Sequence, residues 1–201
     1  MLCDHDDTLE PDALYEIVKA INDTSADVLY TDEDKVSMDG RHYFDPNFKP
    51  DFNLFRLREN NYICHIFVVK KSLTDETGLL RSEFDGAQDF DFILRCCEKA
   101  QKIMHIPKVL YHWRCHMDST AADPSSKAYA YEAGRKAIRE HYQRMGIDAK
   151  VDMTERPGWY RSHIKVQGNP MVSIIIPNKD HTDDLEPVSY THLTLPTNSR
   201  V

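Results

Sequence analysis

An acidic cluster at the start of the chain constrains its fold more than any other feature of the sequence. Asp4, Asp6 and Asp7 directly follow a short apolar run at residues 1–3. We interpret that run as the end of a buried strand, which would put the carboxylates at the carboxyl edge of a sheet, where open α/β proteins bind ligands. Hard oxygen donors in such a position suit Mg2+ or Mn2+. A solvated acidic turn before a helix explains the cluster equally well, because carboxylates near a helix N-terminus are favourable.

The composition indicates one sizeable globular domain that folds in water. The chain has 201 residues, of which 41% are hydrophobic and 29% charged, close to the averages of globular proteins. Its formal net charge of -8 argues against a nucleic-acid partner, because neutralising phosphates requires clustered Lys and Arg. Five cysteines without a CxxC pair predict a reduced, cytoplasmic protein. The sequence has no apolar run of membrane-spanning length and no signal-peptide pattern, which leaves peripheral attachment to a membrane open.

Helical and extended patterns alternate along most of the chain. Leu14, Ile17, Val18 and Ile21 recur at helical spacing, and Thr8 is the expected N-cap. The predicted elements are a helix at 11–22, strands at 26–31 and 61–70, a helix that opens at 86–89, an extended stretch at 103–113 and a long helix from 124–126 to Gly146. The aromatic and proline-rich residues 38–57 are predicted to form a loop folded over a site.

The C-terminal part of the sequence changes character. Residues 155–170 are polar and rich in Pro and Gly, whereas the apolar run at 171–177 is bounded by Pro and predicts a buried parallel strand. Residues 188–201 contain no acidic residue, and their core, SYTHLTLPT at 189–197, looks like a translated sequencing adapter. We therefore exclude this tail from the prediction of the fold.

Two enzyme families use a motif close to residues 4–9 (DHDDTL). The segment resembles the first motif of haloacid-dehalogenase-type phosphatases, in which the first Asp is a nucleophile. It also resembles the Asp-x-Asp motif of family 2 glycosyltransferases. The later motifs follow the order of the glycosyltransferases: LEPDAL at 9–14, DVLYTDED at 27–34, FKP at 48–50, QDFD at 88–91 with Arg95, and YHWR at 111–114.

The resemblance implies a GT-A-like fold, which is an α/β fold with a mixed sheet flanked by helices, here lacking its N-terminal strands. Residues 1–156 would be the C-terminal two-thirds of such a domain and 157–170 a linker. Residues 172–180 (VSIIIPNKD) resemble the first strand and loop of another glycosyltransferase domain, so 171–187 would open a second domain before the non-native tail at 188–201. The parent protein would then be a tandem bacterial enzyme.

The resemblance also assigns roles to individual residues. Asp6 would bind the metal, Asp4 would help to hold the ribose or the metal site, and Asp7 would orient its neighbours. His112 would complete the metal site, with His116 as the competing candidate, and Arg114 could face the diphosphate. Asp89 would be the catalytic base, although Gln88 stands where the family usually has Glu, and a carboxylate that only stabilises a helix N-terminus is the alternative.

Several other polar and aromatic residues receive no catalytic role from the sequence. Asp91 is expected on the surface, and Asp32 and Asp34 are expected to be solvated at a strand end. Tyr111 and Trp113 could stack on sugar rings, although aromatic residues at this density are more often part of a core.

The implied activity is an inverting, metal-dependent transfer of a sugar from a nucleotide-sugar donor to a glycan or lipid-linked acceptor. Mn2+ or Mg2+ would be the cofactor, and cell-envelope polysaccharide would be the product, made on the cytoplasmic side. A phosphatase that uses Asp4 as its nucleophile and an inactive carbohydrate-binding remnant are the alternatives. The sequence identifies neither the sugar nor the acceptor. The pocket for the uracil, thymine or guanine base of the donor would be built largely from strands that precede this chain.

Overall fold

The computed structural model describes residues 1–115, 128–171, 173, 179 and 183. His116, most of the strand predicted at 171–177, the expected start of the long helix at 124–126 and the tail at 188–201 lie outside the described residues. The chain divides into two compact units, Met1–Lys165 and Val166–Val201. All elements described below belong to the first unit.

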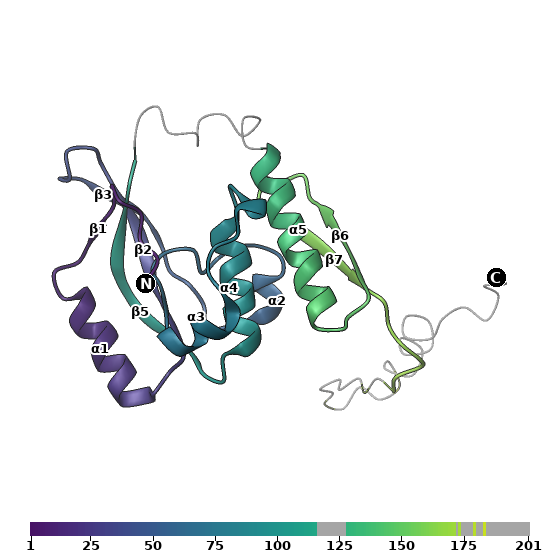
Figure 1. Ribbon diagram of the computed structural model, residues 1–201. Coiled ribbons are helices and arrows are strands. Elements are labelled where there is room, and N and C mark those ends of the chain that lie inside the picture. Colours follow the sequence, from purple (N-terminus) through teal and green to yellow (C-terminus); the bar gives the residue numbers. More distant parts are fainter. Residues whose placement is uncertain (116–127, 172, 174–178, 180–182, 184–201) are drawn as a thin grey trace. The chain divides into compact units, whose positions relative to one another are not determined.

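A mixed five-stranded sheet forms the centre of this unit (Figure 1). Its strands are β1 (Thr8–Leu9), β2 (Val28–Val36), β3 (Tyr43–Asn47), β4 (Phe67–Val69) and β5 (Ile103–Arg114). β2 pairs in parallel with β5, and it pairs antiparallel with β3 along one half and with β4 along the other. β1 pairs antiparallel with the end of β5. The predicted α/β fold class, with a mixed sheet flanked by helices, is therefore confirmed.

Helices lie on both faces of the sheet (Figure 1). α1 (Ala13–Thr24) covers one face, and α4 (Gln88–Lys99) covers the other, where it packs against α3 (Lys71–Thr77) and α5 (Ala128–Arg144). The short helix α2 (Leu54–Leu57) and a 3-10 turn at Ser82–Phe84 complete this side. A separate hairpin of β6 (Ala149–Met153) and β7 (Tyr160–Ile164) packs against α5.

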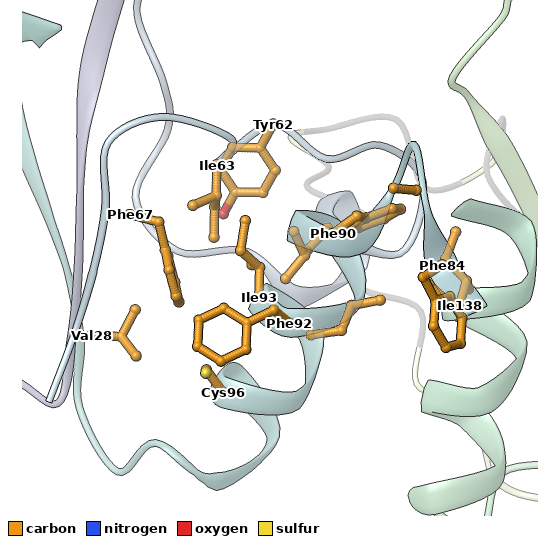
Figure 2. Packing of buried hydrophobic residues seen from close by; sticks show 14 of the residues in the cluster. Val28, Tyr62, Ile63, Phe67, Phe84, Phe90, Phe92, Ile93, Cys96 and Ile138 are labelled. Carbon is orange, nitrogen blue, oxygen red and sulfur yellow. The ribbon is translucent and has the colours of Figure 1, made fainter. Parts of the chain in front are cut away.

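The alternation of side chains along β2 builds two cores. Val28 and Tyr30 point into the larger core, and Leu29 between them joins the smaller core with Ala13 and Ile17 of α1. In the larger core, Phe67 of β4 meets Phe92 edge-on with ring centroids 6.0 Å apart. Figure 2 shows these side chains filling the space between the sheet and α4, with Phe84 and Ile138 continuing the core toward α5. The core therefore fixes α4, whose first turn carries Asp89.

The N-terminal segment differs from its prediction. Residues 1–3 do not end a regular strand, because Leu2 makes only a single bridge to Phe67. Thr8 lies in β1 and does not cap α1, whose N-cap is Asp12. The helix itself was predicted within two residues at each end.

Helix α1 buries less of its apolar surface than its spacing predicted. Ile17 is buried, but Leu14 is 61% and Val18 55% exposed, so this part of the apolar face lies uncovered in the described unit. Periodicity identifies a helix with an apolar face, but it does not identify what covers that face.

Several elements begin or end at residues that differ from the predicted ones, for local reasons. β2 continues through the acidic run at residues 32–34, and β5 stays continuous across Pro107 because a register shift next to Thr31 leaves residues 107–108 outside the paired positions. The strand predicted at 61–70 is extended and paired only at β4, since Cys64 has a positive φ of 34°. β3 and α2 lie inside the predicted loop, and β7 lies inside the predicted linker.

The end of α5 agrees with the prediction. A glycine within the helix leaves space for a tyrosine of the hairpin. Gly146, with φ of 66°, follows the last helical turn. A Cβ atom on Gly134 would lie only 2.1 Å from the Tyr160 hydroxyl, which donates a hydrogen bond of 3.0 Å to the Tyr131 carbonyl. The Tyr160 N–H also donates to the Glu59 carbonyl at 2.8 Å. Tyr160 therefore joins the hairpin to both α5 and the segment after α2.

Replacing Gly134 with Ala should destabilise the protein although Ala favours helices. The added methyl must displace the buried Tyr160 ring, and overpacking of this kind costs about 1–3 kcal/mol, more than the roughly 1 kcal/mol gained from helix propensity. Urea unfolding monitored by circular dichroism measures the difference. In the Gly134→Ala/Tyr160→Val double variant the two losses should be less than additive, and strict additivity would contradict the proposed clash.

Candidate functional site

The acidic turn at residues 4–7 is anchored to β5 by hydrogen bonds. The Tyr111 hydroxyl donates to the Asp7 carboxylate, and burial together with this contact raises the pKa of Tyr111. The Asp4 N–H donates to the Tyr111 oxygen at 3.2 Å, and the Arg114 N–H donates to Asp7 Oδ1 at 2.7 Å. Asp7 thus anchors the turn that carries Asp4 and Asp6 to β5.

The Asp4 and Asp6 side chains are both partly exposed to solvent. The Asp4 side chain is 56% exposed and its Oδ2 lies 3.5 Å from His65 Nε2. The Asp6 side chain is 37% exposed, with its Oδ1 3.9 Å from His5 Nδ1. His65 itself is buried, and its Nδ1 has no hydrogen-bond partner among the described residues.

The Arg114 side chain contacts the same turn by donating hydrogen bonds to backbone carbonyls. Its Nε donates to the Asp6 carbonyl at 2.7 Å, and its Nη1 donates to the Met38 carbonyl at 3.0 Å. The guanidinium therefore ties the acidic turn to the loop between β2 and β3. Its predicted role toward a diphosphate stays a prediction.

His112, whose role as a metal ligand stays a prediction, lies between two carboxylates. Its Nδ1 lies 2.5 Å from Asp34 Oδ1, its Nε2 lies 3.2 Å from Glu10 Oε1, and the residue is only 3% exposed. Both ring nitrogens are thus engaged by carboxylates other than Asp6. Within the described part of the chain, no three His, Cys, Asp or Glu side chains gather into a group that could hold a metal ion.

Asp89 lies in the first turn of α4, where the partial positive charge of a helix N-terminus favours a carboxylate. Asn61 donates from Nδ2 to Asp89 Oδ2 at 2.8 Å, and Cys64 Sγ lies 3.9 Å from the same oxygen. Burial, followed by the Asp89 charge, raises the pKa of the Cys64 thiol well above its ordinary value. Cys64 therefore stays a neutral thiol beside the carboxylate, and Asp89 Oδ1 has no hydrogen-bond partner among the described residues.

Two hollows meet at Asn60 and Asn61. The smaller one, of about 250 Å³, is lined by Asp89 together with residues of α5 and of the hairpin. The larger one, of about 410 Å³, is mainly polar and is lined by the ends of β2 and β3, Trp113 of β5, Arg56 of α2, and Arg156 and Trp159 of the β6–β7 loop. Asn61 lines both hollows and donates to Asp89, so the half-buried carboxylate, which lines the smaller hollow, is held by a residue that also lines the larger one.

Lys49 is a residue whose importance sequence reasoning missed. It is only 6% exposed, and its Nζ binds Glu33 Oε2 at 3.0 Å, the Ile63 carbonyl at 2.7 Å and the His65 carbonyl. The two carbonyls flank Cys64, so Lys49 fixes the segment that supplies the partners of Asp89. Its position between Phe48 and Pro50 in a recognised motif was the available signal.

The acidic run at residues 32–34 is not solvated as expected. Asp32 is 3% exposed and accepts from the Lys49 N–H at 2.8 Å, with His105 Nε2 also 2.8 Å from its Oδ1. Glu33 and Asp34 are engaged by Lys49 and His112. Isolated charges are too costly to bury, and Asp32 and Glu33 are buried, and Asp34 partly buried, because each has a partner that is distant in sequence.

Asp91 is also buried, which corrects the expectation that it lies on the surface. It is fully buried, and both of its oxygens accept hydrogen bonds from Arg81, while Arg95 Nε donates to Oδ2 at 2.9 Å. Arg95 in turn donates to the carbonyls of Thr77 and Leu79. This network links α4 to the end of α3 and makes Asp91 structural.

Comparisons with known proteins give two relatives of much greater length. The uncharacterized protein y4gI of Sinorhizobium fredii (strain NBRC 101917 / NGR234) is 46% identical over 188 residues, which are 92% of this chain and 21% of that protein. The O-antigen biosynthesis protein RfbC of Myxococcus xanthus is 40% identical over 179 residues, which are 89% of this chain and 14% of that protein. The chain thus spans about a fifth or less of these relatives. No protein-family model matches it.

Among solved structures, the chain is similar to S. aureus TarS 1-349, with a TM-score of 0.47 and 19% identity over 69% of this chain and 39% of that one. The complex of TarS 1-349 with UDP-GlcNAc gives a TM-score of 0.46 and 18% identity over 67% and 40% of the two chains. Within the described residues, no helix is long and apolar enough to cross a membrane.

Proposed function

We propose that this chain is part of a glycosyltransferase that moves a sugar from a nucleotide-sugar donor to a glycan or lipid-linked acceptor during cell-envelope polysaccharide synthesis. The observation that carries the proposal is Asp89, a half-buried carboxylate in the first turn of α4, which lines the smaller hollow and is held by Asn61, a residue of both hollows. The identity to a relative named for O-antigen biosynthesis supports it. The proposed site of action is the cytoplasmic side of the membrane.

In the proposed reaction, Asp89 takes the proton from the acceptor hydroxyl as that oxygen attacks the anomeric carbon. A new carbon–oxygen bond forms while the bond to the donor diphosphate breaks, and the single displacement inverts the configuration. Asn61 holds Oδ2 of Asp89, which leaves Oδ1 to meet the acceptor. The neutral Cys64 thiol adds no second charge beside the base.

Asp4 and Asp6 are the residues we propose to hold a divalent ion, Mn2+ or Mg2+. A closed three-ligand centre does not fit the described residues, but Mg2+ commonly uses one or two carboxylates together with substrate phosphates and water. Two accessible carboxylates on a turn fixed by Asp7 and Arg114 fit that pattern. When bound, the ion would stabilise the negative charge that develops on the departing nucleoside diphosphate.

Replacing Asp6 with Ala should abolish the coupling between metal and nucleotide binding. Calorimetry on the gene product that contains this chain, with Mn2+ or Mg2+ and with UDP or dTDP, should show metal binding that strengthens with nucleotide in the unaltered protein. In the variant, we expect the affinity for the metal in the presence of nucleotide to fall at least about tenfold, because a carboxylate ligand carries much of the interaction with a hard cation.

His163→Ala on β7 is a matched control away from the turn and should bind as the unaltered protein does. If neither metal nor nucleotide binds to the folded gene product, the glycosyltransferase proposal fails. Phosphate release from a phosphomonoester that is lost in Asp4→Asn would instead support the phosphatase alternative.

A further inference from the structure

The larger hollow has an imbalance between its charged groups. Its carboxylates already have basic partners: Glu33 binds Lys49, Asp34 binds His112, and Asp45 binds Lys35. Its two arginines have none among the described residues. No carboxylate of the described residues lies within ion-pair distance of the Arg56 or Arg156 guanidinium.

Both guanidinium groups gather at one aromatic ring. Arg56 Cζ lies 5.4 Å from the centroid of the Trp159 ring, and Arg156 Cζ lies 4.6 Å from the same centroid. Arg56 Cζ also lies 5.9 Å from the Tyr62 ring. Stacking on aromatic rings orients an arginine without using its N–H donors, and two cations beside one ring repel each other until an anion lies between them.

The position of these arginines relative to Asp89 indicates which molecule would supply the anion. Asn61 lines the hollow of Arg56 and Arg156 and donates to Asp89 at 2.8 Å. A group bound by the arginines would therefore belong to a molecule that extends to the proposed catalytic base. Trp113, which is 42% exposed, lines the same hollow and offers an apolar surface on which a sugar ring can stack.

We propose that the hollow formed by Arg56, Arg156, Trp113 and Trp159 binds an anionic saccharide, namely the acceptor, through a carboxylate or phosphate group close to the reacting hydroxyl. Planar guanidinium groups bind such oxyanions through paired N–H donors. Identifying the bound saccharide as the acceptor rests on the proposed glycosyltransferase function. The binding site itself is defined by the residues of the hollow.

The tryptophans make this hollow directly measurable. The chain has two tryptophans, and both line it, so its intrinsic indole fluorescence reports on occupation of this hollow. The experiment titrates the full chain with a galacturonic acid trisaccharide, a phosphorylated galactose trisaccharide, a neutral galactose trisaccharide and UDP. The first two probes distinguish carboxylate from phosphate, and UDP tests whether the anion is the donor diphosphate.

We expect at least one anionic saccharide probe to bind at least about ten times more tightly than the neutral trisaccharide, because a hydrogen bond between charged groups outweighs a neutral one. Arg56→Gln and Arg156→Gln should each remove most of that preference and weaken its dependence on salt, while the corresponding Lys variants should keep part of it. Arg161→Gln is the matched control, since it removes the same charge from β7 at a residue that does not line this hollow.

Equal affinity for charged and neutral saccharides, or a preference that the Gln variants retain, would overturn the proposal. Tighter binding of UDP that is lost in the same variants would also overturn it, since the arginines would then serve the donor. Binding does not require turnover, so the two proposals can fail separately. A protein that prefers the anionic saccharide but never transfers sugar would refute only the proposed function.

Discussion

Replacing Asp89 with Asn should lower kcat for sugar transfer by about 10²- to 10⁴-fold, the range that a positioned general base contributes. The amide has nearly the same shape and can still accept the hydrogen bond from Asn61, so the fold and the binding of nucleotide should be preserved. Initial rates with a nucleotide-sugar donor, measured together with nucleotide affinity by calorimetry, separate the chemical step from donor binding.

Asp85→Asn is the matched control for this experiment. Asp85 is exposed, lies four residues before Asp89 and loses the same charge, and its variant should keep the activity of the unaltered protein. Retention of more than about a tenth of the activity in Asp89→Asn would contradict the assignment, because loss of a general base costs far more than that. Asp89 would then be a carboxylate that stabilises the first turn of α4.

Replacing Lys49 with Met should cost about 3–5 kcal/mol of unfolding free energy, because removing one partner of a buried ion pair leaves the other charge uncompensated. Met fills a similar volume but leaves Glu33 with only its hydrogen bond from Asn47, and it leaves the carbonyls of Ile63 and His65 without the ammonium group. Chemical denaturation gives the difference in stability.

Lys35→Met tests whether burial is the cause. Lys35 lies two residues after Glu33 on β2 and pairs with Asp45 at the surface, with 38% and 65% of the two side chains exposed. Such a pair contributes about 0–1 kcal/mol, so this variant should unfold almost as the unaltered protein does. Similar losses for the two lysines would contradict the buried role of Lys49.

Much of the fold was predictable because it follows from local pattern. The spacing of Leu14, Ile17 and Val18 located α1, and Gly146 located the end of α5. β3 (YFDPN) escaped prediction because all five of its residues are exposed, so it has no buried face to produce an alternating pattern. β7 follows a Pro- and Gly-containing segment, and that composition suggested a linker.

The site was less predictable because its contacts join residues far apart in the sequence. Motif resemblance singled out Asp89, but nothing local indicates that Asn61 holds its carboxylate. An acidic residue is expected in water unless a partner is known, and the arginines that bury Asp91 are recognisable as partners only in three dimensions. The position of His112 between Asp34 and Glu10 was not predictable either, because Asp34 and Glu10 are far from it in the sequence. The catalytic and metal roles taken from the resemblance stay predictions.

Under the proposed function, the hairpin of β6 and β7 is a place where the choice of acceptor would change. Its loop brings Arg156 and Trp159 to the larger hollow, while its attachment depends on Tyr160 beside Gly134. Neither the acidic turn nor the first turn of α4 belongs to it. Under the proposed function, a few substitutions or an exchanged loop between residues 154 and 159 would therefore change which polymer is bound and leave the acidic turn and Asp89 unaltered.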